Sequence, residues 1–211
     1  MFSLETVAVV TIGYFFGSIP FGVIVAKKMG VNIFNVGSGN PGATNVLRSL
    51  GKPAGYAVFI LDFLKGVLAT VWFKFGLVAF SGDPSLALWG LPAAVLGHTY
   101  PIFSNFKGGK GVATAMGGLL GVMPGCLLIG LVSWIIIFIT TRYVAVASIG
   151  FGLSLPVCAI VSFWSSEDKT SHFAKIVLAI FIMAWIIWRH RENLQRLKDG
   201  TENRFEQKNK D

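Results

Sequence analysis

Long apolar runs alternate along this chain with short polar, glycine-rich or charged segments. A bilayer core about 30 Å thick needs about 20 apolar residues per helix, and five runs approach or exceed that length. They cover residues 4–26, 54–80, 85–102, 143–164 and 173–188. Each run is predicted to form one membrane-spanning helix.

A further apolar run, from Gly111 to Thr141, is longer than one span needs. Gly121, Pro124 and Gly125 interrupt it with residues that favour a turn and disfavour a helix interior. The run is therefore predicted to form two helices, which makes about seven in total. Both would be short, because about 15 residues rise only about 22 Å at 1.5 Å per residue. Such helices are expected to be buried within the bundle.

The basic residues provide a test of this helix count. Cytoplasmic segments of membrane proteins carry an excess of Lys and Arg, and the chain has seven such residues from Arg189 onward and four between Lys27 and Lys52. Both segments are therefore predicted to be cytoplasmic, which requires an even number of crossings between them. The run from Gly111 to Thr141 meets this requirement if it crosses twice. The N-terminus and the polar loop 165–171 then lie outside.

The predicted fold class is an all-α polytopic membrane protein with the N-terminus outside and the C-terminus cytoplasmic. It is expected to be a single domain, residues 1–211, with a basic cytoplasmic tail at about 190–211. The composition agrees, since 54% of the residues are hydrophobic and 13% are charged, whereas soluble domains are about 25% charged. The net charge of +8 follows from this topology, and no nucleic-acid partner is expected. No Lys or Arg precedes the first run, which is therefore expected to remain as a helix.

The segment from Gly37 to Arg48, GSGNPGATNVLR, is the most informative polar one, with three glycines and an Asn-Pro pair in its first six positions. The pattern predicts an exposed turn just before a helix. Glycines let successive backbone N–H groups converge on an anion, and a helix N-terminus adds partial positive charge. Ser38 and Asn40 offer further donors, and Arg48 suits bidentate binding of a phosphate. The alternative is a tight interhelical loop, with Arg48 as a membrane-flanking charge.

A second segment, FKGGKGVAT from Phe106 to Thr114, repeats this chemistry with two lysines among three glycines ahead of another apolar run. It is not a Walker A loop, because Ser104 and Gly111 stand where that motif requires Gly and Ser or Thr. Nucleotide hydrolysis therefore has little support. The alternative interpretation is a basic loop that flanks the membrane.

Two histidines lie in predicted cytoplasmic segments. The acyltransferase pattern of a histidine closely followed by an aspartate fails at His98, because Phe103 and its neighbours include no carboxylate. A hydrogen-bonded structural histidine is therefore a better interpretation there than a general base. His190 and Asn193 are expected at i and i+3 on one helix face, where they could bind a shared ligand. The alternative for this segment is a solvated amphipathic tail.

Topology brings these polar segments to one membrane face, which strengthens the functional interpretation of each. Carboxylates are scarce: Asp62 is the one within the membrane region, so an Asp-rich metal site is not expected. Asp62 and Lys65, at i and i+3, are expected to pair. Cys126 and Cys158 lie in apolar runs without metal-ligand spacing and are interpreted as packing residues.

Gly37–Arg48, Gly97–Gly111 and Arg189–Leu197 closely resemble the motifs of the acyl-phosphate-dependent glycerol-3-phosphate acyltransferases, the PlsY type. The resemblance covers nearly the whole chain. It implies a bacterial inner-membrane enzyme with seven helices that acylates glycerol 3-phosphate from acyl phosphate instead of acyl-CoA or acyl carrier protein. The product would be 1-acylglycerol 3-phosphate (lysophosphatidate), a precursor in phospholipid synthesis.

The same resemblance implies a set of site residues. The catalytic residues are expected to be Ser38, Arg48, Lys107, His190 and Asn193. The substrate-binding residues are expected to be Gly37, Gly39, Asn40, Gly42, Asn45, His98, Gly108, Gly109 and Lys110. No cofactor or metal is implied, and the partners would be the two substrates, membrane lipid and, functionally, the enzyme that forms acyl phosphate. Family members often have serine two residues after Tyr143, where this chain has Ala145, with Ser148 three further on.

A transporter or channel for a phosphorylated solute is the competing function. It would also place glycines and lysines near a cytoplasmic opening, but it predicts polar residues across the bilayer and no acyl product. The predicted outer halves of the helices are almost wholly apolar. We found no internal repeat of the kind on which many transporter folds are built.

Labelling of single cysteines from each side of the membrane tests the predicted topology. Residues 35–52, 103–110 and 190–211 are expected to react from the cytoplasm, and residues 165–171 from outside. A tail that is labelled from outside would mean that the run from Gly111 to Thr141 crosses only once.

Overall fold

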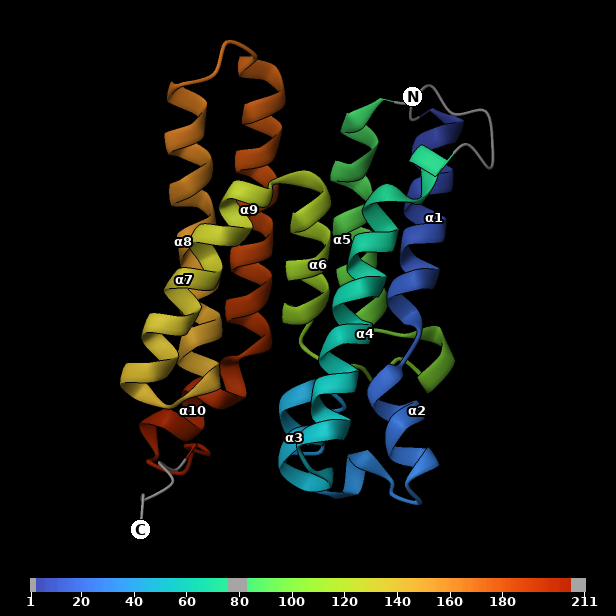
Figure 1. Cartoon of the computed structure of the whole chain (residues 1–211), viewed down its shortest axis with the longest axis vertical. Coiled ribbons are helices and arrows are strands. Elements are labelled where there is room, and N and C mark those ends of the chain that lie inside the picture. Colours follow the sequence, from blue (N-terminus) through green and yellow to red (C-terminus); the bar gives the residue numbers. More distant parts are fainter. Residues whose placement is uncertain (1–2, 76–82, 206–211) are drawn as a thin grey trace. The chain divides into compact units, whose positions relative to one another are not determined.

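The computed structural model describes residues 3–75 and 83–205, and the chain divides into two compact units, Met1–Pro124 and Gly125–Asp211. Within the described residues the secondary structure consists of helices and turns, with no β-strand (Figure 1). Six helical segments of this part are long and apolar enough to cross a membrane, and α6 is a shorter apolar helix. The predicted all-α polytopic fold is confirmed. The single domain stays a prediction.

In its described residues, unit 1 contains six α-helices, of which α1, α4 and α5 are the longest. Their bounds are α1 Leu4–Ser18, α2 Phe21–Lys28, α3 Ala43–Leu50, α4 Lys52–Val71, α5 Ala87–Thr99 and α6 Val112–Val122. The first apolar run is divided into α1 and α2 at Pro20, the residue that precedes α2, because proline removes a backbone donor. Residues 76–80 of the second predicted run lie outside the described part of the chain.

The predicted interruption of the run from Gly111 to Thr141 is confirmed, since α6 ends at Val122 and α7 begins at Pro124. The lengths differ from the prediction in one respect. α6 has 11 residues and is short, but α7 has 18 and is long enough to cross a membrane. The physical reason is that proline suits the first position of a helix, so Pro124 begins α7 at once instead of extending the turn.

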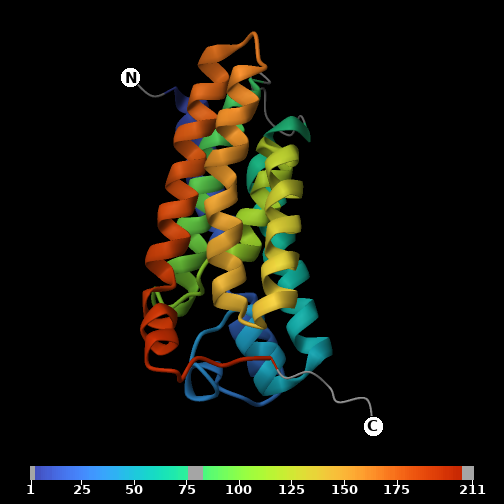
Figure 2. The ribbon, with the colours of Figure 1, turned by 90° about the vertical axis from the view of Figure 1, so that its left-hand side faces the viewer.

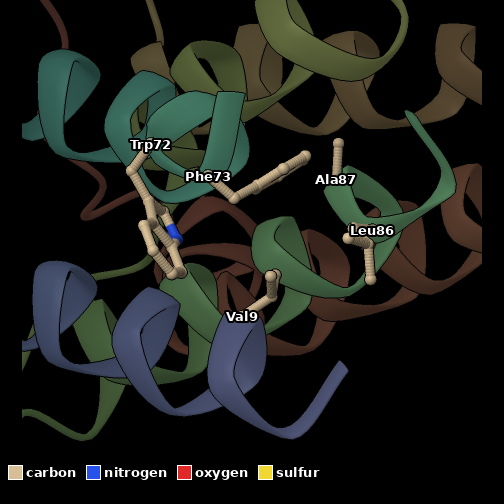
Figure 3. Close-up of a cluster of buried hydrophobic side chains, with 5 residues drawn as sticks. All are labelled: Val9, Trp72, Phe73, Leu86 and Ala87. Atoms are coloured by element: carbon tan, nitrogen blue, oxygen red, sulfur yellow. The ribbon is translucent and has the colours of Figure 1, made fainter. Parts of the chain in front are cut away.

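An apolar cluster lies near the start of α1. It contains Val9, Trp72, Phe73, Leu86 and Ala87, which come from α1, from the 3-10 segments Trp72–Phe75 and Pro84–Leu86, and from α5 (Figure 3). A second cluster lies around α3. It contains Ala26, Ile33, Val46, Ala54 and Val58, and it packs α2 and α3 against the beginning of α4. This second cluster fixes the helix that follows the first glycine-rich segment.

Glycines allow the helices of unit 1 to pack with main-chain contact. A β-carbon at Gly17 of α1 would collide with the carbonyl oxygen of Ala94 in α5. A β-carbon at Gly66 of α4 would collide with the carbonyl oxygen of Thr114 in α6. Small residues at such contacts are typical of membrane proteins, where close approach replaces the hydrophobic effect between helices.

Both glycine-rich segments of unit 1 lie at the same end of its bundle. Figures 1 and 2 show α2 and α3 at that end, together with the segment that joins α5 to α6. This arrangement follows from the directions of the helices. The chain enters this end of the bundle through α1 and α5 and leaves it through α4 and α6.

Up to Phe205, where the described residues end, unit 2 contains three long helices and one short one. Their bounds are α7 Pro124–Thr141, α8 Val144–Trp164, α9 Lys169–Arg189 and α10 Arg191–Lys198. α8 packs along α9. The carboxylate of Asp168 accepts a hydrogen bond from the backbone N of Ser171 at 3.1 Å and so caps α9. After α10 the chain returns to the α7–α8 turn, where the Phe205 backbone N donates to the Arg142 carbonyl at 3.0 Å (Figure 2).

Replacement of Gly66 by alanine tests the close packing of α4 on α6. We expect Gly66→Ala to lower the free energy of unfolding by about 1–3 kcal/mol, because the added methyl group forces the two main chains apart. The measurement is reversible unfolding of the purified protein in micelles. Gly125→Ala is the matched control, since a β-carbon there meets nothing within 4 Å. Equal stability of the two variants would contradict the packing described above.

Candidate functional site

The first glycine-rich segment forms the turn that the sequence predicts, directly before a helix. Gly37 and Gly39 have φ values of 57° and 67°, a left-handed conformation that glycine adopts without strain. Gly42 then precedes the first residue of α3 and occupies the N-cap position. The backbone amides at the start of α3 therefore follow immediately on the turn, as an anion site at a helix N-terminus requires.

Asn45 stabilises this turn from within α3. Its side-chain oxygen accepts a hydrogen bond from the Ser38 backbone N at 2.9 Å, and its side-chain nitrogen donates to the Val36 carbonyl at 3.0 Å. Asn45 is 5% exposed, and a β-carbon at Gly37 would collide with its oxygen. These contacts give Asn45 a structural role that the sequence alone did not indicate.

The polar side chains of this segment divide into two groups. Asn40 is used locally, since its side-chain oxygen accepts a hydrogen bond from the Gly42 backbone N at 2.8 Å. Ser38 and Arg48 are exposed, and Arg48 lies in the last turn of α3. A hydroxyl and a guanidinium group are therefore accessible on the same short loop and helix.

The second glycine-rich segment packs against His98, at the end of α5. The Gly109 backbone N donates to the His98 carbonyl at 3.1 Å. A β-carbon at Gly108 would collide with that carbonyl, and one at Gly109 would collide with the imidazole Nε2. Both positions therefore require glycine because His98 leaves no space for a side chain, whether or not an anion binds there.

The segment is bounded by residues with positive φ. Asn105 and Phe106 have φ values of 52° and 59°, which are uncommon for residues other than glycine. Gly111, at φ 83°, precedes α6 as its N-cap. The predicted position of the lysine-bearing loop directly before a helix is confirmed, and Lys107 is exposed.

His98 is paired with a carboxylate after all, but from a different helix. Its Nδ1 lies 3.5 Å from Oδ1 of Asp62 in α4 and 3.2 Å from the hydroxyl of Thr114 in α6. The predicted pairing of Asp62 with Lys65 is also confirmed, with Nζ and Oδ1 2.8 Å apart. The sequence around His98 gives no sign of this contact, because α4 and α5 meet only in the folded bundle.

In unit 2, His190 lies at the junction between α9 and α10, where it is the C-cap residue of α9 and the N-cap residue of α10. The sequence predicted that His190 and Asn193 lie on one helix face. In the structure His190 instead precedes α10, the helix that contains Asn193. Its Nδ1 lies 2.8 Å from the Ile186 carbonyl oxygen. A carbonyl oxygen can only accept, so Nδ1 carries the proton and Nε2 lacks one in the neutral ring.

Asn193 is oriented by a residue that the sequence analysis did not single out. Its side-chain nitrogen donates to Glu202 Oε1 at 2.7 Å, while Arg196 Nε donates to Oε2 of the same carboxylate at 2.7 Å. The Glu202 side chain is 4% exposed. The sequence offers little indication of this role for Glu202. The residue lies two positions after Gly200, a glycine with positive φ that follows α10.

Ser148, near the segment where Ala145 departs from the family pattern, is buried. Its hydroxyl accepts a hydrogen bond from Trp134 Nε1 at 3.4 Å.

The structure therefore divides the predicted site residues between two units. Unit 1 holds the residues of both glycine-rich segments and His98, at one end of its bundle. His190 and Asn193 belong to unit 2, and their place relative to the two loops stays a prediction.

Comparison with known proteins identifies relatives over almost the whole chain. The family model described as glycerol-3-phosphate acyltransferase matches residues 7–200. The glycerol-3-phosphate acyltransferase of Aquifex aeolicus is 43% identical over 202 residues, which cover 96% of this chain and 100% of that protein. The corresponding protein of Geobacter sulfurreducens is also 43% identical, over 96% of this chain and 98% of its own length.

Two solved structures also match the fold. The crystal structure of PlsY (YgiH), an integral membrane glycerol 3-phosphate acyltransferase, in its glycerol 3-phosphate form has a TM-score of 0.82 and 43% identity, covering 95% of this chain and 96% of that one. Its lysophosphatidic acid form has a TM-score of 0.79. Because sequence and fold agree over this length, the chain belongs to the glycerol-3-phosphate acyltransferase family.

Proposed function

We infer that this protein transfers an acyl group from acyl phosphate to glycerol 3-phosphate, and that it does so at the cytoplasmic face of a bacterial inner membrane. The observation that carries the proposal is the position of two basic, glycine-rich loops at one end of unit 1, in a multi-pass chain of this family. Both proposed substrates carry a phosphate group. Two loops suited to anions therefore match two phosphorylated ligands.

The proposed reaction needs little activation of the nucleophile. Acyl phosphate is a mixed anhydride with a good leaving group. The hydroxyl oxygen of glycerol 3-phosphate forms a bond to the acyl carbon, the bond from that carbon to the phosphate oxygen breaks, and the hydroxyl proton passes to a base. Holding the two reactants in contact supplies a large part of the rate acceleration in such reactions.

Exposed cations suit the charge that moves during this step. Negative charge accumulates on the departing phosphate, and donors that are already oriented toward it stabilise the transition state. We assign this role to Lys107 and Arg48, with backbone amides of the two loops and the hydroxyl of Ser38 as further donors. The glycines and Lys110 are assigned to binding of the phosphate groups.

The tautomer of His190 limits its role in the proposed site. Because Nδ1 donates to the Ile186 carbonyl, Nε2 is the nitrogen that faces a ligand as an acceptor. We propose that it accepts a hydrogen bond from the substrate hydroxyl, with Asn193 beside it. The proton itself passes to the phosphate of the bound acyl phosphate, which becomes more basic as the anhydride bond breaks.

Incubation of the purified protein with acyl phosphate and glycerol 3-phosphate tests the function. We expect lysophosphatidate from acyl phosphate and none from acyl-CoA. The same protein in vesicles tests the transporter hypothesis, which predicts uptake of labelled glycerol 3-phosphate without an acyl product. Uptake without lysophosphatidate would overturn the proposal.

Loss of either cation is expected to weaken the reaction strongly. Arg48→Ala or Lys107→Ala should raise the KM for a phosphorylated substrate, or lower kcat, at least about tenfold, because a charge-assisted hydrogen bond contributes roughly 1.5–3 kcal/mol. Steady-state kinetics with each substrate varied in turn measures the effect. Lys27→Ala is the matched control, an exposed lysine at the end of α2. Normal kinetics in both site variants would contradict the assignment.

Replacement of His190 by glutamine separates an acceptor from a base. The glutamine oxygen takes the place of Nε2 as a hydrogen-bond acceptor but does not take up a proton near neutral pH. We expect His190→Gln to retain measurable turnover, without loss of a limb in the pH–rate profile at about pH 6.5, the reference pKa of histidine. His172→Gln is the control. Loss of turnover together with that limb, while both substrates still bind, would make His190 the base.

A further inference from the structure

Four helices of unit 1 meet at a set of buried polar groups. Asp62 and Lys65 form an ion pair on α4, His98 of α5 contacts Asp62, and Thr114 of α6 contacts His98. Lys65 Nζ also donates to the carbonyl oxygen of Ile19, at the end of α1, at 2.8 Å. We call Asp62, Lys65 and His98 the buried network.

The burial of these groups is costly and calls for an explanation. The side chains of Asp62 and Lys65 are each 3% exposed, and that of His98 is 8% exposed. A buried ion pair contributes little to stability compared with well-packed apolar residues of similar size. Ionisable residues within membrane helices mark functional sites more often than packing.

One side of the buried network reaches the second glycine-rich loop. The His98 carbonyl accepts the Gly109 backbone N, and the backbone of Gly109 lies against the imidazole Nε2. The opposite edge of the same ring, at Nδ1, faces Asp62. A change in the orientation of this ring therefore moves the backbone of the loop that bears Lys107 and Lys110.

The other side of the buried network reaches the first loop. The Ile19 carbonyl lies where α1 ends, before Pro20 starts the turn into α2. Gly22 of α2 lies against the backbone of Pro41, within the first loop, because a β-carbon there would collide with the Pro41 carbonyl oxygen. The hydrogen bond from Lys65 therefore fixes the α1–α2 break, and α2 in turn contacts the first loop.

We propose that Asp62, Lys65 and His98 are positioning residues that set the two phosphate-binding loops at a fixed distance and orientation. The inference rests on the proposed function. Asp62 and Lys65 do not contact substrate in this account, and His98 acts through the loop that it supports instead of binding substrate directly. Two phosphorylated reactants then meet in the same geometry in every turnover.

A double variant distinguishes positioning from mere stability. Asp62→Leu combined with Lys65→Met replaces the ion pair by apolar side chains, which buried sites tolerate well, but it removes the contacts to His98 and to Ile19. We expect membrane yield and thermal midpoint close to those of the unmodified protein, with the KM of both substrates raised at least about tenfold. Unchanged KM values in a stable double variant would overturn the proposal.

Two substitutions of His98 test its part separately. The side-chain nitrogen of asparagine can replace Nδ1, whereas leucine has no polar group. We expect His98→Leu to raise the KM of at least one substrate about tenfold and His98→Asn to remain within about threefold of the unmodified protein. Thr70→Val is the matched control, since this buried hydroxyl donates to the carbonyls of Gly66 and Val67 in its own helix and is not part of the buried network. Equal KM values in the two His98 variants would contradict the proposal.

The outcomes for the two proposals are distinguishable. Absence of lysophosphatidate from the unmodified protein would overturn the proposed function. Normal turnover there, with unchanged KM values in the variants, would overturn the positioning role alone. If the double variant and His98→Leu both fail to accumulate in the membrane, while His98→Asn behaves as the unmodified protein, the buried network serves folding and the positioning role is overturned.

Discussion

A loop that binds phosphate through its backbone is useful only if its backbone does not move. In unit 1 the contact between Asp62 and His98 connects the interior of the bundle to the second glycine-rich loop at its end, and we propose that it holds that loop in place. The carbonyl and the ring of His98 both touch the glycines of the second loop. Lys65 compensates the charge of Asp62 and extends the same set of contacts to the end of α1. In the positioning role that we propose, the geometry of both loops depends on this one buried group of polar side chains.

Glycine serves two physical purposes in this protein. In the first loop, Gly37 and Gly39 adopt left-handed conformations that a β-carbon would disfavour. In the helices and in the second loop, glycines permit main-chain contact, as Gly66 does with Thr114 and Gly108 does with His98. Glycines in such a motif are therefore explained by close approach of neighbouring atoms as well as by an anion site.

Unit 2 uses a carboxylate for a related purpose. Glu202 accepts hydrogen bonds from Asn193 and Arg196, which lie one turn apart on α10. The segment after α10 also contacts the α7–α8 turn through Phe205 and Arg142. The side chain that we assign to the site is thus oriented by residues that follow it in the chain, beyond the helix that bears it.

The sequence by itself determined the features that depend on near neighbours. The lengths of the apolar runs predicted the spans, Pro124 marked the break before α7, and glycines marked the turns that precede α3 and α6, because helix formation and turn chemistry are local. The i, i+3 spacing likewise predicted the pair of Asp62 and Lys65. The family motifs indicated which polar residues belong to the expected site.

Only the tertiary structure decided which distant groups meet. The pairing of His98 with Asp62 requires α4 and α5 to pack so that the two side chains lie at the same level of the bundle. The contact of Asn193 with Glu202 requires the chain to turn back after α10. The contacts of Asn45 require the first glycine-rich loop to fold back onto α3. None of these is encoded by a period or a short motif. Each depends on the packing distances and side-chain directions that many residues far apart in the chain set together.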